Sequence, residues 1–330
     1  MDYKQLFKNF SNHNILILGD VMIDSYQWGK VERISPEAPV PICSVQKIEN
    51  RLGGAGNVAL NIKAMGAKPI LCSVIGEDIE GKTLLSLMKE EDMDTQGIYT
   101  SAFRPTTIKT RIIGNNSQML RIDKEITNYL TIGEEDNFLN KLLSIINTQK
   151  IDAIIFQDYD KGVLTPNLIS KLVTIATEKQ IPTAVDPKHK NFSYYKNVTL
   201  FKPNLKELKE GLKIEFDKPT LENLTDASLL LHSKQNIEEV FITLSEYGVF
   251  IADYQTPRAK VNMFPAHLRK IADVSGAGDT VISLAALCLA EKLDADTMAK
   301  ISNLAGGLVC ETVGVVPIEK ERLYRELISL

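Results

Sequence analysis

A glycine-rich string late in the chain is the strongest candidate for chemistry in this sequence. Residues 273–280 read DVSGAGDT, and the apolar stretch at 281–291 that follows predicts a helix. Gly276 and Gly278 let the backbone approach a ligand closely, and amide groups at a helix N-terminus attract anions. The amides of Gly276, Ala277 and Gly278 are therefore predicted to hold the charge that develops on a phosphoryl group during its transfer.

Asp279 lies at the end of this string, in the first turn of the predicted helix. A carboxylate there can accept the proton of a hydroxyl group that attacks phosphorus, so Asp279 is the candidate catalytic base. An ordinary helix N-terminus with an acidic first turn is the alternative, since such ends commonly carry acids. The length of the string favours the catalytic interpretation.

A second glycine-rich turn occurs much earlier in the chain. It contains Gly53, Gly54 and Asn57 and leads into an amphipathic stretch at 55–65. The glycines permit a tight turn from a strand into a helix, and the Asn57 amide can hydrogen-bond a sugar hydroxyl. The turn lacks both the G-x-G-x-x-G spacing of dinucleotide-binding folds and the GK[ST] of phosphate-binding P-loops. This argues against a dinucleotide-dependent oxidoreductase.

Together the two strings resemble the two signatures of the ribokinase-like (PfkB) carbohydrate kinases. The resemblance extends from about residue 14 to residue 317. It implies ATP-dependent phosphorylation of a sugar hydroxyl, with Asp279 as the base. Ser275 stands where many relatives carry Thr, which is a small departure. A catalytically silent sugar- or nucleotide-binding protein of the same fold is the alternative from another class, and the intact Asp279 argues against it.

Shorter strings resemble the family's nucleotide-binding elements. Asn204 and Glu207 match its Asn-x-x-Glu element and would hold hydrated Mg²⁺ through water, because Mg²⁺ keeps most of its waters. A helix N-cap with a capping-box Glu is the alternative for this pair. The residues that the resemblance assigns to ATP are Asp186, Lys188, Thr243, Ser245, Gly248 and Asn303. A requirement for a monovalent cation stays open.

The segments at 19–26 (GDVMIDSY) and 33–41 (RISPEAPVP) narrow the substrate. With the strings at 118–123 and 158–162, they resemble the subgroup that phosphorylates D-glycero-β-D-manno-heptose 7-phosphate. The resemblance implies attack by the anomeric hydroxyl, heptose 1,7-bisphosphate as the product, and a role in making ADP-heptose for lipopolysaccharide. Ribose, fructose 1-phosphate and nucleosides remain alternative substrates, since one fold hosts many functions.

The same resemblance assigns residues to the sugar phosphate. Asp20 and Asp24 would accept hydrogen bonds from sugar hydroxyls, and Asn57 would contact the sugar beside Gly53 and Gly54. A sugar phosphate also needs cations, and Arg suits bidentate contacts with phosphate. The cationic candidates are Lys109, Arg111, Arg121 and Lys161, and Asp158 completes the predicted substrate site. A solvated surface charge is the alternative for each cation.

Short apolar runs alternate with amphipathic stretches through most of the chain. Such alternation predicts a doubly wound α/β fold, with helices on both faces of a mostly parallel sheet. The predicted strands lie at 14–20, 69–75, 152–157, 182–186, 198–201 and 239–244. Two β-rich segments, at about 24–50 and 104–123, interrupt the alternation, and the second is a hairpin around 114–116. We expect them to form a small β-sheet lid whose exposed edges favour a homodimer.

The composition and the absence of certain motifs argue against several other classes of protein. A net charge of −4 does not favour nucleic-acid binding, and no apolar run reaches the ~20 residues of a membrane span. With no secretory pattern at the N-terminus, we expect a cytoplasmic protein. The four scattered cysteines predict neither a zinc site nor a redox pair. No HxGH-type motif is present, so we expect one kinase domain over 1–330 and a separate nucleotidyltransferase.

Overall fold

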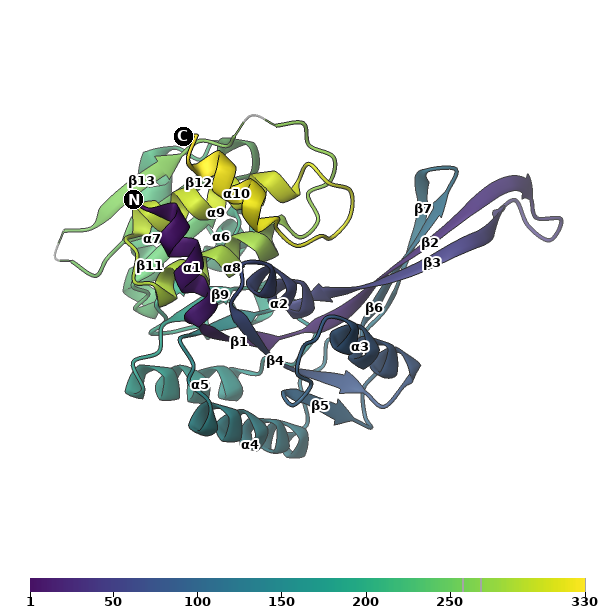
Figure 1. Cartoon of the computed structure of the whole chain (residues 1–330), viewed down its shortest axis with the longest axis horizontal. Helices are drawn as coiled ribbons and strands as arrows, with labels where there is room; N and C mark the ends of the chain where they lie inside the picture. Colours follow the sequence, from purple (N-terminus) through teal and green to yellow (C-terminus); the bar gives the residue numbers. More distant parts are fainter. Residues whose placement is uncertain (257, 268, 330) are drawn as a thin grey trace.

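A nine-stranded sheet forms the centre of the fold in the computed structural model, which describes residues 1–256, 258–267 and 269–329 (Figure 1). The strand order is β13-β12-β11-β10-β9-β8-β1-β4-β5. The strands are β1 (Asn14–Gly19), β4 (Lys68–Gly76), β5 (Ile98–Ser101), β8 (Ala153–Gln157), β9 (Thr183–Asp186), β10 (Leu200–Phe201), β11 (Glu239–Thr243), β12 (Val249–Asp253) and β13 (Lys260–Phe264). Neighbouring strands run parallel except that β12 runs antiparallel to both β11 and β13, which confirms the mostly parallel sheet.

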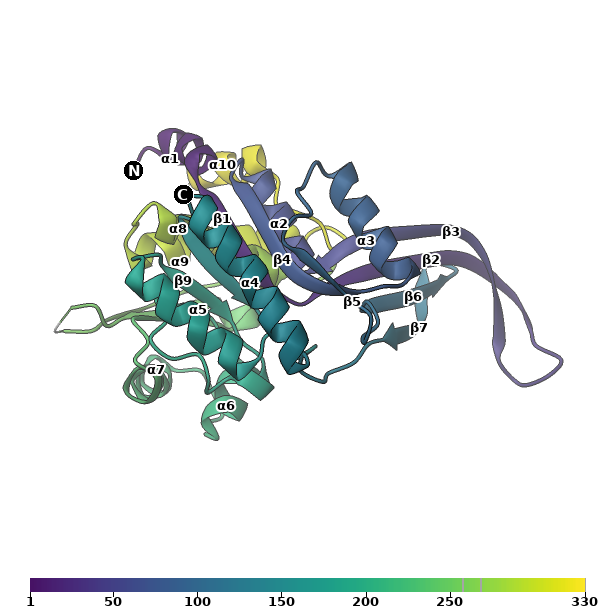
Figure 2. The ribbon, with the colours of Figure 1, turned by 90° about the horizontal axis from the view of Figure 1, so that it is seen from below.

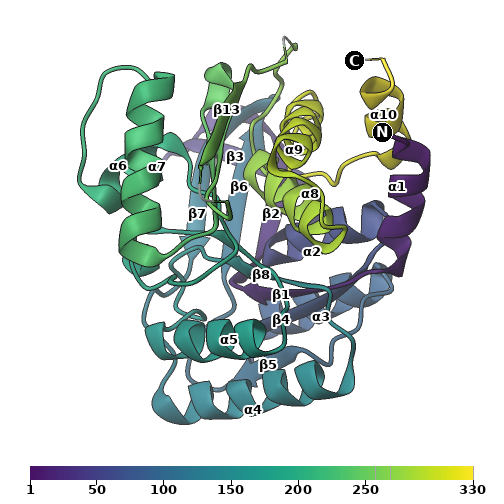
Figure 3. The same ribbon diagram turned by 90° about the vertical axis from the view of Figure 1, so that its left-hand side faces the viewer.

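Helices cover both faces of this sheet, as Figure 3 shows for α8 and α9 on one side and α4 and α5 on the other. The first face carries α1 (Tyr3–Asn9), α2 (Ala55–Ala64), α3 (Ile79–Glu90), α8 (Ala277–Ala290), α9 (Ala295–Val309) and α10 (Lys320–Leu327). The second carries α4 (Ile132–Thr148), α5 (Pro166–Glu178), α6 (Leu205–Leu212) and α7 (Leu221–Gln235).

The two faces explain why the central strands are uninterrupted apolar runs. Successive side chains of a strand point to opposite faces, so in β1 Ile15 and Ile17 join one core while Leu16 and Leu18 join the other. Since both faces are covered by helices, both sets of side chains must be apolar. The predicted strands all form, with ends that shift by a few residues. The helix predicted at 281–291 begins earlier, at Ala277.

A separate four-stranded sheet projects from this body (Figures 1 and 2). Its order is β3-β2-β6-β7, with β2 (Val21–Ile34), β3 (Pro41–Gly54), β6 (Ile108–Gly114) and β7 (Ser117–Lys124). Asn115 and Asn116, both with positive φ, form the turn between β6 and β7, as the hairpin pattern predicted. We call this sheet the lid sheet. Its first two strands start directly after β1 and end directly before α2, so the turn with Gly53 and Gly54 lies at the base of the lid sheet.

Two further expectations concern the described part of the chain as a whole. No helix among the described residues is long and apolar enough to span a membrane. The four cysteines are free thiols, three of them buried, as their scattered positions predicted.

Candidate active site

The first turn of α8 holds the predicted base and the predicted anion pocket. Gly276 caps this helix with a φ of +82°, a conformation that favours glycine. A Cβ at Gly276 would lie 2.9 Å from Nδ2 of Asn57, so this position also requires glycine for space. Asp279 is 4% exposed and faces the interior. The glycines and the carboxylate therefore meet at one helix N-terminus, as the string at 273–280 predicted.

Three side chains donate hydrogen bonds to the Asp279 carboxylate. Oδ2 accepts from Nδ2 of Asn57 at 2.7 Å. Oδ1 accepts from Nε2 of Gln157 at 3.1 Å and from the hydroxyl of Tyr159 at 2.6 Å. Burial raises the pKa of Asp279 to about 6, and the hydrogen bonds from Asn57 and Tyr159 limit that rise. Asp279 is therefore ionised at neutral pH and able to take a proton.

A buried ion pair lies beside the anion pocket. Nζ of Lys202 lies 3.1 Å from Oδ2 of Asp186, and the Lys202 side chain is 3% exposed. A Cβ at Gly278 would lie 3.7 Å from each of these two atoms. A cation beside a helix N-terminus favours a phosphate group. Sequence reasoning assigned Lys202 no role, although a lysine that directly follows a buried strand was an available signal.

The residues predicted for ATP lie at the carboxyl ends of adjacent strands. Asp186 ends β9, Asn204 follows β10, and Thr243 ends β11. Ser245 and Gly248, both with positive φ, form the turn that follows Thr243. Ligands of open α/β sheets bind beyond such strand ends, so the structure brings these residues to the edge where nucleotides bind.

The remaining nucleotide-side residues have protein partners. Asn204 and Glu207 form a reciprocal capping box at the start of α6, with both hydrogen bonds 2.9 Å long. The structure therefore contains the helix capping box that was the alternative interpretation of this pair. The other oxygen of Glu207 accepts a hydrogen bond from Lys188. Asn303 lies on α9, where its Nδ2 donates to the carbonyl of Pro265 at 2.9 Å.

Comparison with known proteins identifies the family. The family model for pfkB family carbohydrate kinases matches residues 12–321. This chain belongs to the PfkB family of carbohydrate kinases. It is therefore a phosphotransferase that uses an alcohol group as acceptor, and ATP is the phosphate donor that the family implies.

Two curated relatives carry the name bifunctional protein HldE. The protein from Helicobacter pylori (strain HPAG1) is 39% identical over 300 residues, which cover 91% of this chain and 63% of the relative. The protein from Methylobacillus flagellatus is 40% identical over 320 residues, which cover 96% of this chain and 63% of the relative. The chain thus spans less than two thirds of the length of these relatives.

Solved structures support the fold of this kinase. Phosphofructokinase-2 from Escherichia coli in complex with potassium has a TM-score of 0.78 at 19% identity, covering 96% of this chain and 99% of that one. Arabidopsis thaliana ribokinase complexed with ribose and ATP has a TM-score of 0.69 at 14% identity, covering 94% and 98%. At these identities the likeness shows a shared ribokinase-like fold.

Two of the carboxylates predicted for the substrate instead hold the kinase's own loops. Asp20 accepts hydrogen bonds from the backbone amides of Tyr159, Lys161 and Val163, at 2.9 to 3.1 Å. Asp158 accepts from Asn191, Tyr195 and the amide of Asp160, all at 2.8 Å. Both carboxylates are 1% exposed. Asp20, predicted for sugar hydroxyls, and Asp158, predicted for the substrate site, therefore have their hydrogen bonds within the protein, where they fix the loop after β8 that carries Tyr159.

Asp24 lies on the lid sheet and is bonded to a predicted cation. Nη1 of Arg111 lies 2.5 Å from Oδ1 of Asp24, and the Arg111 side chain is 15% exposed. A Cβ at Gly53 would collide with the Asp24 carboxylate, so glycine is required where β3 meets this pair. At Gly54 a φ of +59° and the nearby Asp20 carbonyl impose the same requirement. The structure thus brings Asp24, Arg111 and the glycine turn together.

The other predicted cations lie farther along the lid sheet or at its base. Nζ of Lys109 contacts Asp123 and Glu125, both at 3.1 Å, and Nζ of Lys161 contacts Glu125 at 2.8 Å. Arg121 is 52% exposed and pairs with Asp123 at 3.0 Å. Lys109 therefore shares Glu125 with Lys161 and Asp123 with Arg121, and Arg121 is the most exposed of the three cations.

Sequence reasoning missed Arg51, which shares a face with these cations. In the strand register Asp24 lies opposite both Arg51 and Lys109, and opposite residues share a face of a sheet. Arg51 and Arg111 both lie over the ring of Tyr26, at 5.1 and 5.2 Å from its centroid. Nη1 of Arg51 donates to the carbonyl of Val315 at 3.1 Å. The face of the lid sheet that carries Lys109, Arg111 and Arg51, which we call the cationic face, therefore contacts the main body at Val315.

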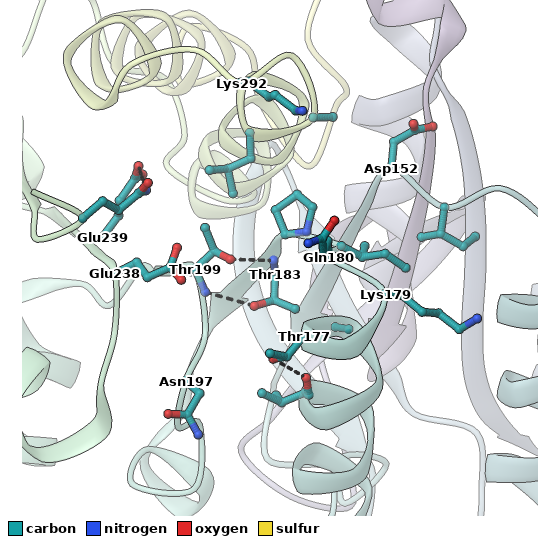
Figure 4. A pocket seen from close by; sticks show the side chains of 18 of the residues that line it. Asp152, Thr177, Lys179, Gln180, Thr183, Asn197, Thr199, Glu238, Glu239 and Lys292 are labelled. Atoms are coloured by element: carbon teal, nitrogen blue, oxygen red, sulfur yellow. Dashed lines mark hydrogen bonds between the residues drawn. The ribbon is translucent and has the colours of Figure 1, made fainter.

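A cavity of about 1110 Å³ lies at the opposite edge of the main sheet, where the parallel strands begin (Figure 4). At its centre the backbone amide and hydroxyl of Thr183 exchange hydrogen bonds with those of Thr199, at 3.2 and 3.0 Å. Glu238 and Glu239 also line it. None of the predicted site residues lines this cavity, so it is separate from the candidate active site.

Proposed function

We propose that this PfkB kinase transfers the γ-phosphoryl group of ATP to the anomeric hydroxyl of D-glycero-β-D-manno-heptose 7-phosphate. The observation that carries the chemistry is the buried Asp279 carboxylate beside the amides of Gly276–Gly278. The sugar assignment is supported by the segments at 19–26 and 33–41, and by 39–40% identity to proteins named HldE. The product would be heptose 1,7-bisphosphate, and a separate nucleotidyltransferase would act in a later step of ADP-heptose formation, after the 7-phosphate has been removed.

The proposed mechanism needs one proton transfer and one phosphoryl transfer. The anomeric oxygen forms a bond to the γ-phosphorus as the bond to the β–γ bridging oxygen breaks, and ADP leaves. Asp279 takes the hydroxyl proton. The amides of Gly276–Gly278 and the ammonium of Lys202 stabilise negative charge on the phosphoryl oxygens, since they are already oriented before the reaction. Closing the lid sheet would exclude water and limit wasteful hydrolysis.

The donor set on the nucleotide side fits hydrated Mg²⁺. Asn204 and Glu207 offer amide and carboxylate oxygens, which are suited to the waters of an outer-sphere ion. No group of three or more His, Cys, Asp or Glu residues that could enclose a metal occurs in the described ranges. When bound, Mg²⁺ would supply positive charge to the phosphates. A monovalent-cation requirement is tested by comparing K⁺ with Na⁺ in the assay.

The cationic face of the lid sheet supports a phosphorylated sugar. Arg111 and Arg51 converge on Tyr26 near the base of the lid sheet, and planar guanidinium groups bind phosphate oxygens in pairs. Lys109 and Lys161 add positive charge at the same end of the lid sheet, where both form ion pairs with Glu125. We therefore assign the sugar phosphate to this end of the lid sheet and leave Arg121 outside the phosphate site.

The opposite face of the lid sheet supports a homodimer. Ile48 and Leu120 lie in the same row of the strand register with Gln27 and Ile112, and both are exposed. Ile122, in the next row, is exposed as well. An exposed apolar face of this kind is suited to pairing with a second copy. We propose the cytoplasm as the compartment, since ATP is the donor.

The test of this function is ADP release measured with a panel of acceptors. The panel contains the heptose 7-phosphate, sedoheptulose 7-phosphate, fructose 1-phosphate, fructose 6-phosphate, ribose and adenosine. Turnover confined to the heptose phosphate is the expected result. Turnover on another acceptor would refute the substrate assignment while leaving Asp279 and the fold in place. A folded protein that turns over none of them with Mg²⁺ and ATP present would refute the proposed substrate and favour a silent binding protein.

A further inference from the structure

Tyr159 is the most exposed of the three donors to Asp279. The other two, Asn57 and Gln157, are buried, with 0% and 1% exposure. Tyr159 is partly exposed and comes from the loop after β8. Its Cε2 would lie 3.5 Å from a Cβ at Gly54, in the turn assigned to the sugar.

The ring of Tyr159 also borders the nucleotide side. Nζ of Lys188, a residue assigned to ATP, lies 5.6 Å from the centre of the ring. The ring of Tyr159 therefore borders both the turn assigned to the sugar and a residue assigned to ATP, while its hydroxyl contacts Asp279. Burial and the adjacent Asp279 raise the pKa of its hydroxyl well above the ordinary value, so the hydroxyl stays protonated and can only donate to the carboxylate.

The hydroxyl of Tyr159 fills the hydrogen-bonding capacity of Oδ1. A carboxylate oxygen offers about two acceptor sites, and on Oδ1 Gln157 takes one and Tyr159 takes the other. An acceptor hydroxyl must donate to the base before it loses its proton. Oδ2 accepts one hydrogen bond, from the buried Asn57, and on Oδ1 the more exposed donor is Tyr159, so the position on Oδ1 that a substrate hydroxyl can reach is held by Tyr159.

We infer that the Tyr159 hydroxyl is a placeholder for the acceptor hydroxyl of the sugar, which displaces it when the substrate binds. This inference rests on the proposed function, because it takes Asp279 as the base. While the sugar is absent, the placeholder keeps water from donating to Oδ1 of Asp279. The bound sugar restores the lost hydrogen bond with its own hydroxyl. Tyr159 is thus a positioning residue that makes the base available to the sugar and unavailable to water.

The test is Tyr159→Phe, which keeps the ring and removes only the hydroxyl. ATP hydrolysis without any sugar should rise roughly tenfold, because water gains access to the base. The dissociation constant of the sugar should fall about three- to tenfold, since one hydrogen bond no longer has to be broken. The matched control is Tyr129→Phe, which removes a tyrosine hydroxyl that donates to Asn191 at 2.8 Å and should change neither quantity.

A pH profile separates this role from a merely structural one. The groups that face Asp279 are Asn57 from α2, Gln157 and Tyr159 from β8 and its loop, Asp186 from β9, and Lys202 after β10. Since the Tyr159 hydrogen bond lowers the pKa of Asp279, its loss should move the acid limb of kcat/KM to higher pH. The acid limb of the wild-type kinase should lie near pH 6.

The outcomes distinguish this inference from the proposed function. Faster sugar-independent hydrolysis in Tyr159→Phe supports the placeholder even if the heptose phosphate proves to be the wrong substrate. Normal sugar phosphorylation by the wild-type kinase, with unchanged hydrolysis and a lower kcat in Tyr159→Phe, would overturn the placeholder and leave the function standing. A lower melting temperature without any rise in hydrolysis would overturn it as well, because it would assign Tyr159 a structural role.

Discussion

Asp279 and Glu239 are both buried carboxyl groups of the main body, but they lie at opposite edges of the nine-stranded sheet. Asp279 accepts three hydrogen bonds and has the Lys202 ammonium nearby, and its pKa is raised only to about 6. Glu239 accepts one, from Gln255 at 2.9 Å, and within the described ranges its Oε2 has no partner.

The surroundings of Glu239 add to the cost of its charge. Burial, together with the acidic Asp253, Glu238 and Asp294, raises the pKa of Glu239 to about 8. Burial alone would push both carboxyls toward the neutral form. The number of donors and the sign of the neighbouring charge decide which of them is ionised at neutral pH. The edge with three donors holds a carboxylate that is mainly ionised at neutral pH, and the edge with one donor holds a carboxyl group that is mainly protonated.

The largest effect on activity is expected at the edge that holds Asp279. Asp279→Asn keeps the shape of the side chain but cannot take a proton, so kcat should fall on the order of 10²–10⁴-fold. Isothermal titration should still detect ATP binding, because the amides of Gly276–Gly278 and Lys202 are unchanged. Near-normal turnover in this variant would remove Asp279 from the base role and would make the two edges chemically equivalent.

The second prediction concerns the free energy of unfolding and the edge that holds Glu239. The folded pKa of Glu239 is raised above the ordinary value of 4.5 to about 8. Between those values the folded state keeps a proton that the unfolded state releases, so stability falls as pH rises across this window. Glu239→Gln removes the effect and should stabilise the kinase at pH 9 by up to about 5 kcal/mol, with little change at pH 4.5.

Urea unfolding at the two pH values measures this difference. The matched control is Glu178→Gln on the exposed surface of α5, which should leave both midpoints unchanged. A Glu239→Gln variant that is equally stabilised at both pH values would show that packing, not ionisation, distinguishes the two edges.

The smallest effect is expected on the lid sheet, where a partly buried cation is compared with an exposed one by the KM for the sugar phosphate. Arg111 is 15% exposed and bonded to Asp24, whereas Arg121 is 52% exposed. Arg111→Met should raise the KM for the sugar phosphate by about 10- to 100-fold, because a partly buried guanidinium contributes most to phosphate binding. Arg121→Met should raise it less than about threefold, since exposed ion pairs contribute little. Equal effects on KM would move the phosphate site outward along β7.

Much of the fold and the reactive centre could be predicted from the sequence. The apolar runs predicted the parallel strands, and Asn115 and Asn116 predicted the lid hairpin, because these signals depend on residues that are close together in the chain. The string at 273–280 likewise predicted that Asp279 and the glycines share one helix N-terminus. Nothing in the strings at 19–26 and 158–162 separated Asp24, which meets Arg111, from Asp20 and Asp158, which face the protein interior.

The sequence by itself therefore determined the family, the layered fold and the location of the proposed base. Only the tertiary structure decided which carboxylates remain available to a substrate, that Tyr159 donates a hydrogen bond to Asp279, and that Arg51 and Arg111 both lie over the ring of Tyr26. These features depend on the direction of each side chain and on contacts between segments far apart in the chain. The number of donors that reach a buried carboxylate is set by such contacts, and no local pattern of residues records it.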